Sequence, residues 1–195
     1  MRLDPAVLEG GVVHLAPLSR ADLPELTRAA LAAPEIWQHI PYPMRTPHDV
    51  EAFVARALLE HEQGTRLPLT TRLRASGELI GGSSLFLINP SVPSVEIGST
   101  WIVPAWQRSA VNSEAKLLQL RHGFEVLGCE RVELKTDIRN LRSRAAIARL
   151  GAREEGVLRA HMRRTEGSLR DTVMFSIVAP EWPEVRERLE RSAAR

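Results

Sequence analysis

The segment from Ser94 to Ile138 constrains the fold more than any other part of the chain. It contains a strand-like run, SVEIGSTWIV at 94–103, then a loop and an amphipathic helix, and then a second strand-like run, CERVELKTDI at 129–138. Pro104 ends the first run, because proline cannot donate a hydrogen bond to a sheet ladder. Two strands joined by a crossover helix lie parallel in one sheet. The segment therefore predicts a parallel strand pair within the fold.

Residue alternation in the first of these strands predicts which side chains share a face, because successive side chains of a strand point to opposite sides. One face should carry Val95, Ile97, Ser99, Trp101 and Val103. The other face should carry Glu96, Gly98, Thr100 and Ile102.

Hairpins and helices flank the parallel pair. Strand pairs joined by tight turns are predicted at 67–88, around Ser76-Gly77, and at 156–178, around the turn TEGS. Helices are predicted after Ser19, over 46–64, from the loop at 107–112 to Gly128, over 140–152 and over 180–195. Thr46 and Asn140 are the expected N-caps of two of them, and Gly151 is the expected C-terminal stop of the helix after Asn140. The order predicts an α/β fold: a mixed, mostly antiparallel sheet with one parallel strand pair and helices on both faces. A chain of 195 residues suits a single domain over 1–195.

Composition disfavours several classes of function. The formal net charge is only +2, from 26 basic and 24 acidic residues, which argues against nucleic-acid binding as the main role. The six histidines are scattered and predict no metal site. The single cysteine, Cys129, rules out an intramolecular disulfide framework and fits a reducing cytoplasm. No apolar run reaches about 18 residues and no signal peptide is evident, so we expect a cytoplasmic protein without membrane association.

The loop QRSAVN at 107–112 is a candidate anion site. Helix N-termini present unpaired N–H groups and the positive end of the helix dipole. The amides of Ser109 to Asn112 could converge on a pyrophosphate, and Arg108 could add a bidentate contact. Phosphate loops commonly contain glycine, whereas this loop has Ala110, which adds only a methyl group. On these residues alone, a phosphate site and an ordinary strand-to-helix connection remain equally open.

The whole pattern of the chain, with its order of elements, resembles the GNAT N-acetyltransferase superfamily, most closely its branch of ribosomal-protein N-terminal (alanine/serine) acetyltransferases. Gln107 matches the start of the family's pyrophosphate loop, whereas Ala110 and Asn112 replace its small residues. The stretch DIRNLRSRAAIARLGA resembles the family's second signature, with matches at Asn140, Ser143, Leu150 and Gly151. The resemblance covers roughly residues 11–183 and implies a GNAT-like fold.

The resemblance implies acetyl-CoA as cosubstrate, held between the strands at 95–103 and 130–138, and no metal. Backbone groups of Ile102 and Val103 would pair with the pantetheine amides like an added strand. The implied cofactor-binding residues are Ile102, Val103, Gln107, Arg108, Ser109, Ala110, Val111, Asn112, Asn140 and Ser143.

The implied reaction is direct attack of an amine on the thioester. An α-amino group has a pKa of about 8, so roughly a tenth or more is neutral at pH 7 and a weak or water-relayed base suffices. Many GNAT enzymes protonate the leaving thiol with a tyrosine, but Ile147 occupies that position here, which leaves Ser143 as the substitute. The implied catalytic residues are Glu96, Asn140 and Ser143, and the other candidate bases are Glu133, Asp137 and His161.

The stretch IWQHIPYPM at 36–44 lies where GNAT relatives shape the acceptor pocket, although a packed loop between helices would look the same. The acceptor-side candidates are Trp37, His39, Tyr42 and His161. The expected acceptor is a peptide α-amine, including that of a ribosomal protein, or a small amine, and we expect a monomer or a homodimer. Two other functions remain open: a catalytically weak GNAT-fold CoA-binding module, and a ribosome- or nucleic-acid-associated protein that uses the arginine-rich second half.

Overall fold

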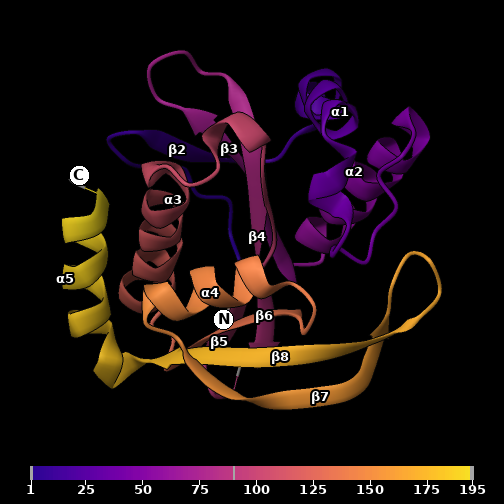
Figure 1. The fold of residues 1–195 in the computed structure, drawn as a ribbon. Coiled ribbons are helices and arrows are strands. Elements are labelled where there is room, and N and C mark those ends of the chain that lie inside the picture. The colour runs from indigo at the N-terminus through magenta and orange to yellow at the C-terminus, as the bar shows by residue number, and fades with distance from the viewer. Residues whose placement is uncertain (1, 90, 194–195) are drawn as a thin grey trace.

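The computed structural model describes residues 2–89 and 91–193, and its strands form one mixed sheet in the order β1-β2-β3-β4-β5-β6-β8-β7 (Figure 1). The strands are β1 (Leu8–Glu9), β2 (Val13–Pro17), β3 (Arg66–Leu73), β4 (Leu79–Asn89), β5 (Ser94–Ile102), β6 (Arg131–Asp137), β7 (Arg153–Arg163) and β8 (Leu169–Val178). The α-helices are α1 (Leu23–Ala32), α2 (Pro47–Glu62), α3 (Ala110–Arg121), α4 (Leu141–Leu150) and α5 (Trp182–Ala193).

The predicted fold class is confirmed. β5 and β6 pair in parallel, whereas the other neighbouring strands of the described sheet pair antiparallel. The short strand β1 was not predicted, because two residues are too few to show alternation. The predicted terminal helix over 180–195 corresponds to α5, and its positions 194–195 lie outside the described residues. Within the described residues, no helix is long and apolar enough to cross a membrane.

Helices cover both faces of the sheet, as predicted. Figure 1 shows α1 and α2 on one side of the strands and α3 and α5 on the other. The larger core cluster joins the sheet to α3, α4 and α5 through residues such as Leu120, Ile147 and Val185. A second cluster, which includes Leu26 and Val54, joins the sheet to α1 and α2. We refer to these two sides as the α3 face and the α1/α2 face.

The predicted alternation along β5 is wrong beyond Ile97. Val95 and Ile97 lie in the core on the α3 face, but Trp101 lies in the core on the α1/α2 face. The cause is a β-bulge: Ser99 has φ +49°, and the register of β5 with β4 shifts between Gly82 and Ser84. A bulge inserts one residue and reverses the faces of every later position. Residue types alone do not reveal it, because Trp101 is apolar and can enter either core.

The carboxylate of Glu114 on α3 holds the turn between β1 and β2. It accepts hydrogen bonds from the backbone N–H groups of Gly11 (2.8 Å), Val12 (2.8 Å) and Val13 (2.7 Å). A Cβ at Gly10 would lie 2.7 Å from this carboxylate, so glycine permits the close approach. The Glu114 carboxylate therefore joins α3 to the first strands, and its three backbone hydrogen bonds compensate for its burial.

We expect Glu114→Gln to lower the free energy of unfolding by about 1–3 kcal/mol, because an amide NH₂ would face backbone donors and leave them unpaired. Chemical denaturation measures the effect. The matched control is Glu130→Gln, at an exposed residue, which should change stability by less than about 0.5 kcal/mol. Equal stabilities of the two variants would show that the Glu114 contacts contribute little.

Lys116 on α3 is buried beneath the bulge of β5. Its Nζ donates to Thr100 Oγ1 (2.7 Å), Gln119 Oε1 (3.0 Å) and Ser83 Oγ (3.3 Å), all of them neutral acceptors. Burial lowers the pKa of Lys116 to about 7. In the unfolded chain a lysine has a pKa of about 10.4. Between these values the unfolded state binds a proton that the folded state has released, so stability must rise with pH.

We expect the free energy of unfolding of the native protein to rise by about 2 kcal/mol more than that of Lys116→Met between pH 7.5 and pH 9, since one proton contributes about 1.4 kcal/mol per pH unit. Urea denaturation at the two pH values measures it. Burial raises the pKa of Cys129 to about 11, which opposes the trend at the alkaline end equally in both proteins. Parallel pH profiles of the two proteins would contradict the assignment to Lys116.

Candidate active site

The parallel strands β5 and β6 are paired over only part of their length. The pairing joins Ser94–Glu96 to Arg131–Glu133, and both strands then continue, to Ile102 and Asp137, without pairing to each other. Each stays in the sheet through its other edge, β5 with β4 and β6 with β8. The two facing edges therefore offer backbone groups to which an extended ligand can add like a strand.

The backbone groups of Ile102 and Val103 were both expected to contact an extended ligand, but Val103 already uses its N–H within the sheet. The Val103 N–H donates to the Ile80 carbonyl on β4 (2.9 Å). Neighbouring residues of a strand direct their backbone groups to opposite edges, so those of Ile102 face β6. The Ile102 carbonyl accepts a hydrogen bond from Gln107 Nε2 (2.8 Å). Ile102 is thus the residue of this pair whose backbone faces the separated strands.

The loop at 107–112 leads into a helix N-terminus, as predicted. Ser109 is the N-cap of α3: its Oγ accepts from the Val111 N–H (3.3 Å) and donates to the Trp106 carbonyl (2.7 Å). Arg108 has φ +61°, a conformation that favours glycine. The first-turn amides, from Ala110 to Asn112, have no partner within the helix. The loop thus presents the positive end of α3 and one exposed guanidinium at the end of β5.

A second helix N-terminus lies across the separated strands. Asn140 caps α4, as predicted, by accepting the Ser143 N–H on its Oδ1 (3.0 Å). Arg142, in the first turn of α4, donates to Gln107 Oε1 (2.7 Å). Gln107 therefore connects the end of β5 with α4, and the N-termini of α3 and α4 lie on either side of the separated strands. Arg142 was not among the predicted site residues, because exposed arginines are frequent in this half of the chain.

The three carboxylates considered as bases all have cationic partners. Glu96 pairs with Lys135 (2.7 Å), and Glu133 pairs with Arg131 (2.8 Å). Asp137 pairs with Arg164 through two contacts, Nε to Oδ2 (2.6 Å) and Nη2 to Oδ1 (2.9 Å). Burial alone would raise the pKa of Asp137, but the hydrogen bonds from Arg164 and from the Arg139 N–H outweigh it and hold that pKa below its ordinary value. Asp137 is consequently a poor proton acceptor.

The two histidines among the predicted residues are better proton acceptors. Partial burial, together with the charges of Lys135 and Arg170, lowers the pKa of His161 on β7. Burial, with the nearby arginines Arg142, Arg164 and Arg170, likewise lowers the pKa of His39. Both imidazoles are therefore mainly neutral at pH 7.

The aromatic residues of 36–44 divide between core and surface. Trp37 is buried, with its ring 5.1 Å from that of Trp101 and its Nε1 donating to the Ala30 carbonyl (3.0 Å). Tyr42 is partly exposed, and its ring lies 5.7 Å from that of Phe53. The structure thus places Trp37 in the core beneath this loop and leaves Tyr42 and His39 at its surface.

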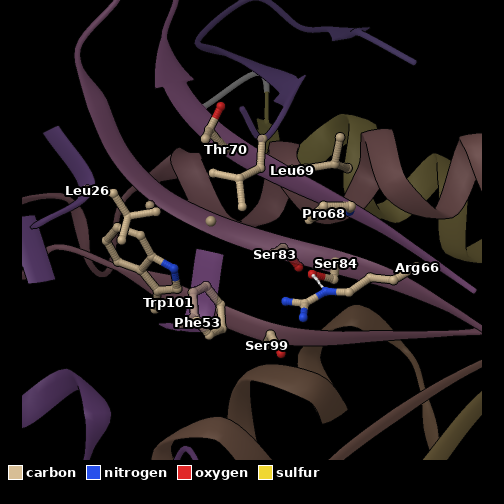
Figure 2. Close-up of a pocket in the computed structure, with 13 residues that line it drawn as sticks. Leu26, Phe53, Arg66, Pro68, Leu69, Thr70, Ser83, Ser84, Ser99 and Trp101 are labelled. Atoms are coloured by element: carbon tan, nitrogen blue, oxygen red, sulfur yellow. Dashed lines mark hydrogen bonds between the residues drawn. The ribbon is translucent and has the colours of Figure 1, made fainter. Parts of the chain in front are cut away.

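A pocket on the α1/α2 face lies beside the bulge (Figure 2). Its floor includes Ser84 and Ser99, and one wall is the buried Arg66 on β3. The Arg66 guanidinium lies between the rings of Phe53 (5.3 Å) and Phe86 (4.8 Å), with Nε donating to Ser84 Oγ (2.8 Å). Sequence reasoning missed Arg66, and the available signal was an arginine beginning the otherwise uncharged run LPLTT.

Comparisons with known proteins agree with this architecture. Residues 13–153 match the family model described as the acetyltransferase (GNAT) domain. The structure is similar to that of a GCN5-related N-acetyltransferase from Brucella melitensis, with a TM-score of 0.89 and 30% identity over 98% of this chain and 86% of that one. No curated protein sequence matches the chain significantly.

Two further solved structures belong to the branch that the sequence resembles. Mycobacterium smegmatis RimJ, in complex with CoA-disulfide, has a TM-score of 0.80 and 25% identity over 96% of this chain and 92% of that one. A Salmonella typhimurium acetyl transferase that modifies the N-terminal serine of a 50S ribosomal subunit protein has a TM-score of 0.79. It shares 18% identity over 89% of this chain and 99% of that one, so this likeness concerns the fold alone.

Proposed function

Because the chain belongs to the GNAT acetyltransferase family, we propose that it binds acetyl-CoA between β5 and β6 and transfers the acetyl group to an amine. The observation that carries this proposal is the separation of the two parallel strands beside the N-terminus of α3. When bound, acetyl-CoA supplies the acetyl group as a reactive thioester. The protein's contribution is to hold that thioester, to position the amine and to move two protons.

The residues at the separated strands suit the parts of this cosubstrate. Ile102 offers backbone groups for the pantetheine amides, and residues 107–112 offer the amides of a helix N-terminus for the pyrophosphate. Arg108 and Arg142 add guanidinium groups, which bind phosphates through paired hydrogen bonds. The solved complex of Mycobacterium smegmatis RimJ with CoA-disulfide supports the binding of a CoA compound by this fold.

Asn140 and Ser143 act from the N-terminus of α4 in this proposal. The Ser143 hydroxyl donates a hydrogen bond to the leaving sulfur, and Asn140 holds the first turn of α4 in place through its cap. Ile147, at the position of the tyrosine used by many GNAT enzymes, is buried in the core on the α3 face and has no proton to give. Ser143 is therefore the nearest replacement on that helix.

The proposed acceptor is an α-amine, of a peptide or of a small molecule, rather than a lysine side chain. Glu96, the proposed base, is ion-paired with Lys135 and acts on the amine through water in this proposal. A weak base suffices for an α-amine with a pKa of about 8, whereas a lysine amine with a pKa of about 10.4 needs a strong one. His161 and Tyr42 lie on the same acceptor side. The Salmonella typhimurium structure makes a ribosomal-protein N-terminus one acceptor to test.

We expect acetyl-CoA at a hundred times its dissociation constant to stabilise the protein by about 2.7 kcal/mol, measured as a thermal shift. Arg108→Gly should weaken that binding by removing a guanidinium. The same variant should keep or raise the stability of the protein alone by about 1 kcal/mol, since glycine accepts φ +61° without strain. The control is Arg74→Gln, at an exposed arginine of the β3–β4 turn, which should bind acetyl-CoA normally. The absence of any shift at millimolar acetyl-CoA would refute the proposal.

Two substitutions at Asn140 separate its cap from its role in the reaction. Asn140→Ser keeps a capping oxygen, whereas Asn140→Ala removes it and should lower stability by about 1 kcal/mol. We expect both variants to lose CoA release on a panel of amines, at least tenfold, because in this proposal the Asn140 amide also faces the thioester, and a serine does not reach as far. Full turnover in Asn140→Ala would refute a catalytic role. Binding of acetyl-CoA without release by the native protein would instead favour the alternative of a CoA-binding module.

A further inference from the structure

A buried cluster with excess positive charge lies at the end of β6. Asp137 belongs to β6, Arg170 and Thr172 belong to β8, and Arg164 lies just after β7. All four residues are at most 8% exposed. Residues 38–41 form the opposite wall of a small pocket whose other lining residues are Arg164 and Arg170. The tip of the β7–β8 hairpin reaches towards the side of α1 and α2 in Figure 1, which brings these segments together.

The single carboxylate of this cluster is already paired. Both oxygens of Asp137 accept hydrogen bonds from Arg164, at 2.6 and 2.9 Å, and one of them also accepts the Arg139 N–H. Asp137 and Arg164 thus neutralise each other through a bidentate contact, which has the geometry of a strong ion pair. The guanidinium of Arg170 is the additional positive charge.

Arg170 has few hydrogen bonds to compensate for its burial. It is 4% exposed, and within the described residues its guanidinium donates one long hydrogen bond, from Nη1 to the His39 carbonyl (3.4 Å). Among the described residues, the buried atoms Arg170 Nε and Thr172 Oγ1 have no hydrogen-bond partner. Thr172 lies opposite Asp137 in the sheet, and Arg170 lies two residues before it on the same face. A buried charge and a buried hydroxyl without partners are costly, and an anion that accepts from both would remove that cost.

The cluster lies next to the proposed acceptor side. Glu96, paired in register with Glu133, occupies the same face of the sheet as Asp137 and Thr172. Glu96 and Tyr42 lie near enough to Arg170 to oppose the lowering of its pKa by burial. The charge of Arg170 in turn contributes to the lowered pKa of His39 and of His161. An acceptor with its amine near Glu96 would therefore bring its neighbouring groups towards Arg170.

We propose that Arg170 and Thr172, supported by the Asp137–Arg164 pair, form a subsite for a carboxylate of the acceptor. The inference rests on the proposed function and narrows its substrate class to α-amines that carry a carboxylate close to the amine. Such a carboxylate comes from a free amino acid or from an acidic side chain near a peptide N-terminus. Arg170 binds the carboxylate through Nε and a terminal nitrogen, and Thr172 donates its hydroxyl hydrogen.

The test compares acceptors with and without the carboxylate, and it expresses kcat/KM per neutral amine, because the carboxylate of a free amino acid also raises the pKa of its α-amine. One arm measures kcat/KM for alanine against alaninamide, and the other measures it for the peptide amides Ala-Asp-Ala and Ala-Asn-Ala. Charge-assisted hydrogen bonds predict a preference for the acid of about tenfold to a hundredfold in one arm, and that arm identifies the source of the carboxylate. Equal kcat/KM for acid and neutral partners in both arms would overturn the subsite while leaving the proposed function intact.

Two variants assign the preference to these residues. Arg170→Gln and Thr172→Val should each reduce the ratio of acid to neutral kcat/KM, with the larger loss at Arg170. The control is Arg163→Gln in the same hairpin, an exposed arginine that donates to the Gly167 carbonyl (2.8 Å), and it should keep the native ratio. A merely structural Arg170 would lower both rates equally and leave the ratio unchanged, which would overturn the proposal. If Arg170→Gln does not fold, the ratios of acid to neutral kcat/KM for Thr172→Val and for the native protein still test the proposal.

Equilibrium binding separates this proposal from the acetyl-transfer proposal. Calorimetry with N-acetylglycine and N-acetylglycinamide, in the presence of CoA, measures recognition of a carboxylate without turnover. Binding of the acid at least tenfold tighter than the amide supports the subsite even if no acceptor is acetylated. Equal binding of the two, or binding of neither, overturns it.

Discussion

The incomplete pairing of β5 with β6 determines how the rest of the molecule is arranged. The two strands share hydrogen bonds over Ser94–Glu96 and Arg131–Glu133 and then separate, yet each remains bound to a strand on its other side. The sheet therefore stays continuous despite the separation. α3 connects the two strands in the chain and packs with both of them in the same core cluster. Its N-terminus comes to lie at the end of β5, opposite the N-terminus of α4, and Gln107 connects the two sides through Ile102 and Arg142.

Three buried charged residues show how differently the fold treats ionic groups. Glu114 receives three backbone hydrogen bonds and ties α3 to the first strands. Lys116, two residues later, has only neutral partners, and burial brings its pKa to about 7. Arg170 has an unpartnered Nε and lies beside a carboxylate that Arg164 already occupies. A charge with full compensation serves structure, whereas the carboxylate of the proposed acceptor would compensate the buried cation Arg170.

Much of the fold could be predicted from local pattern. The caps at Thr46 and Asn140, the glycine after α4 at Gly151 and the crossover between the parallel strands all depend on neighbouring residues, and all are confirmed. The candidate site was predicted less completely. The helix N-terminus at 107–112 is confirmed, but the ion pairs of Glu96 and Asp137 join strands that only the sheet brings together. Arg66 and Arg170 could not be told from the many other arginines, because burial is a tertiary property.

The sequence by itself determined the order of elements, the parallel pair and the position of the α3 N-terminus, because hydrophobic periodicity, capping residues and prolines act over a few residues. Only the tertiary structure decided which face each later residue of β5 occupies, since the bulge at Ser99 turns Trp101 towards α1 and α2. It also decided which charges meet. Arg164 reaches Asp137 and Arg170 reaches the His39 carbonyl because β8 pairs with β6 and the β7–β8 hairpin extends past the end of β6. No local pattern encodes contacts between segments so far apart in the chain.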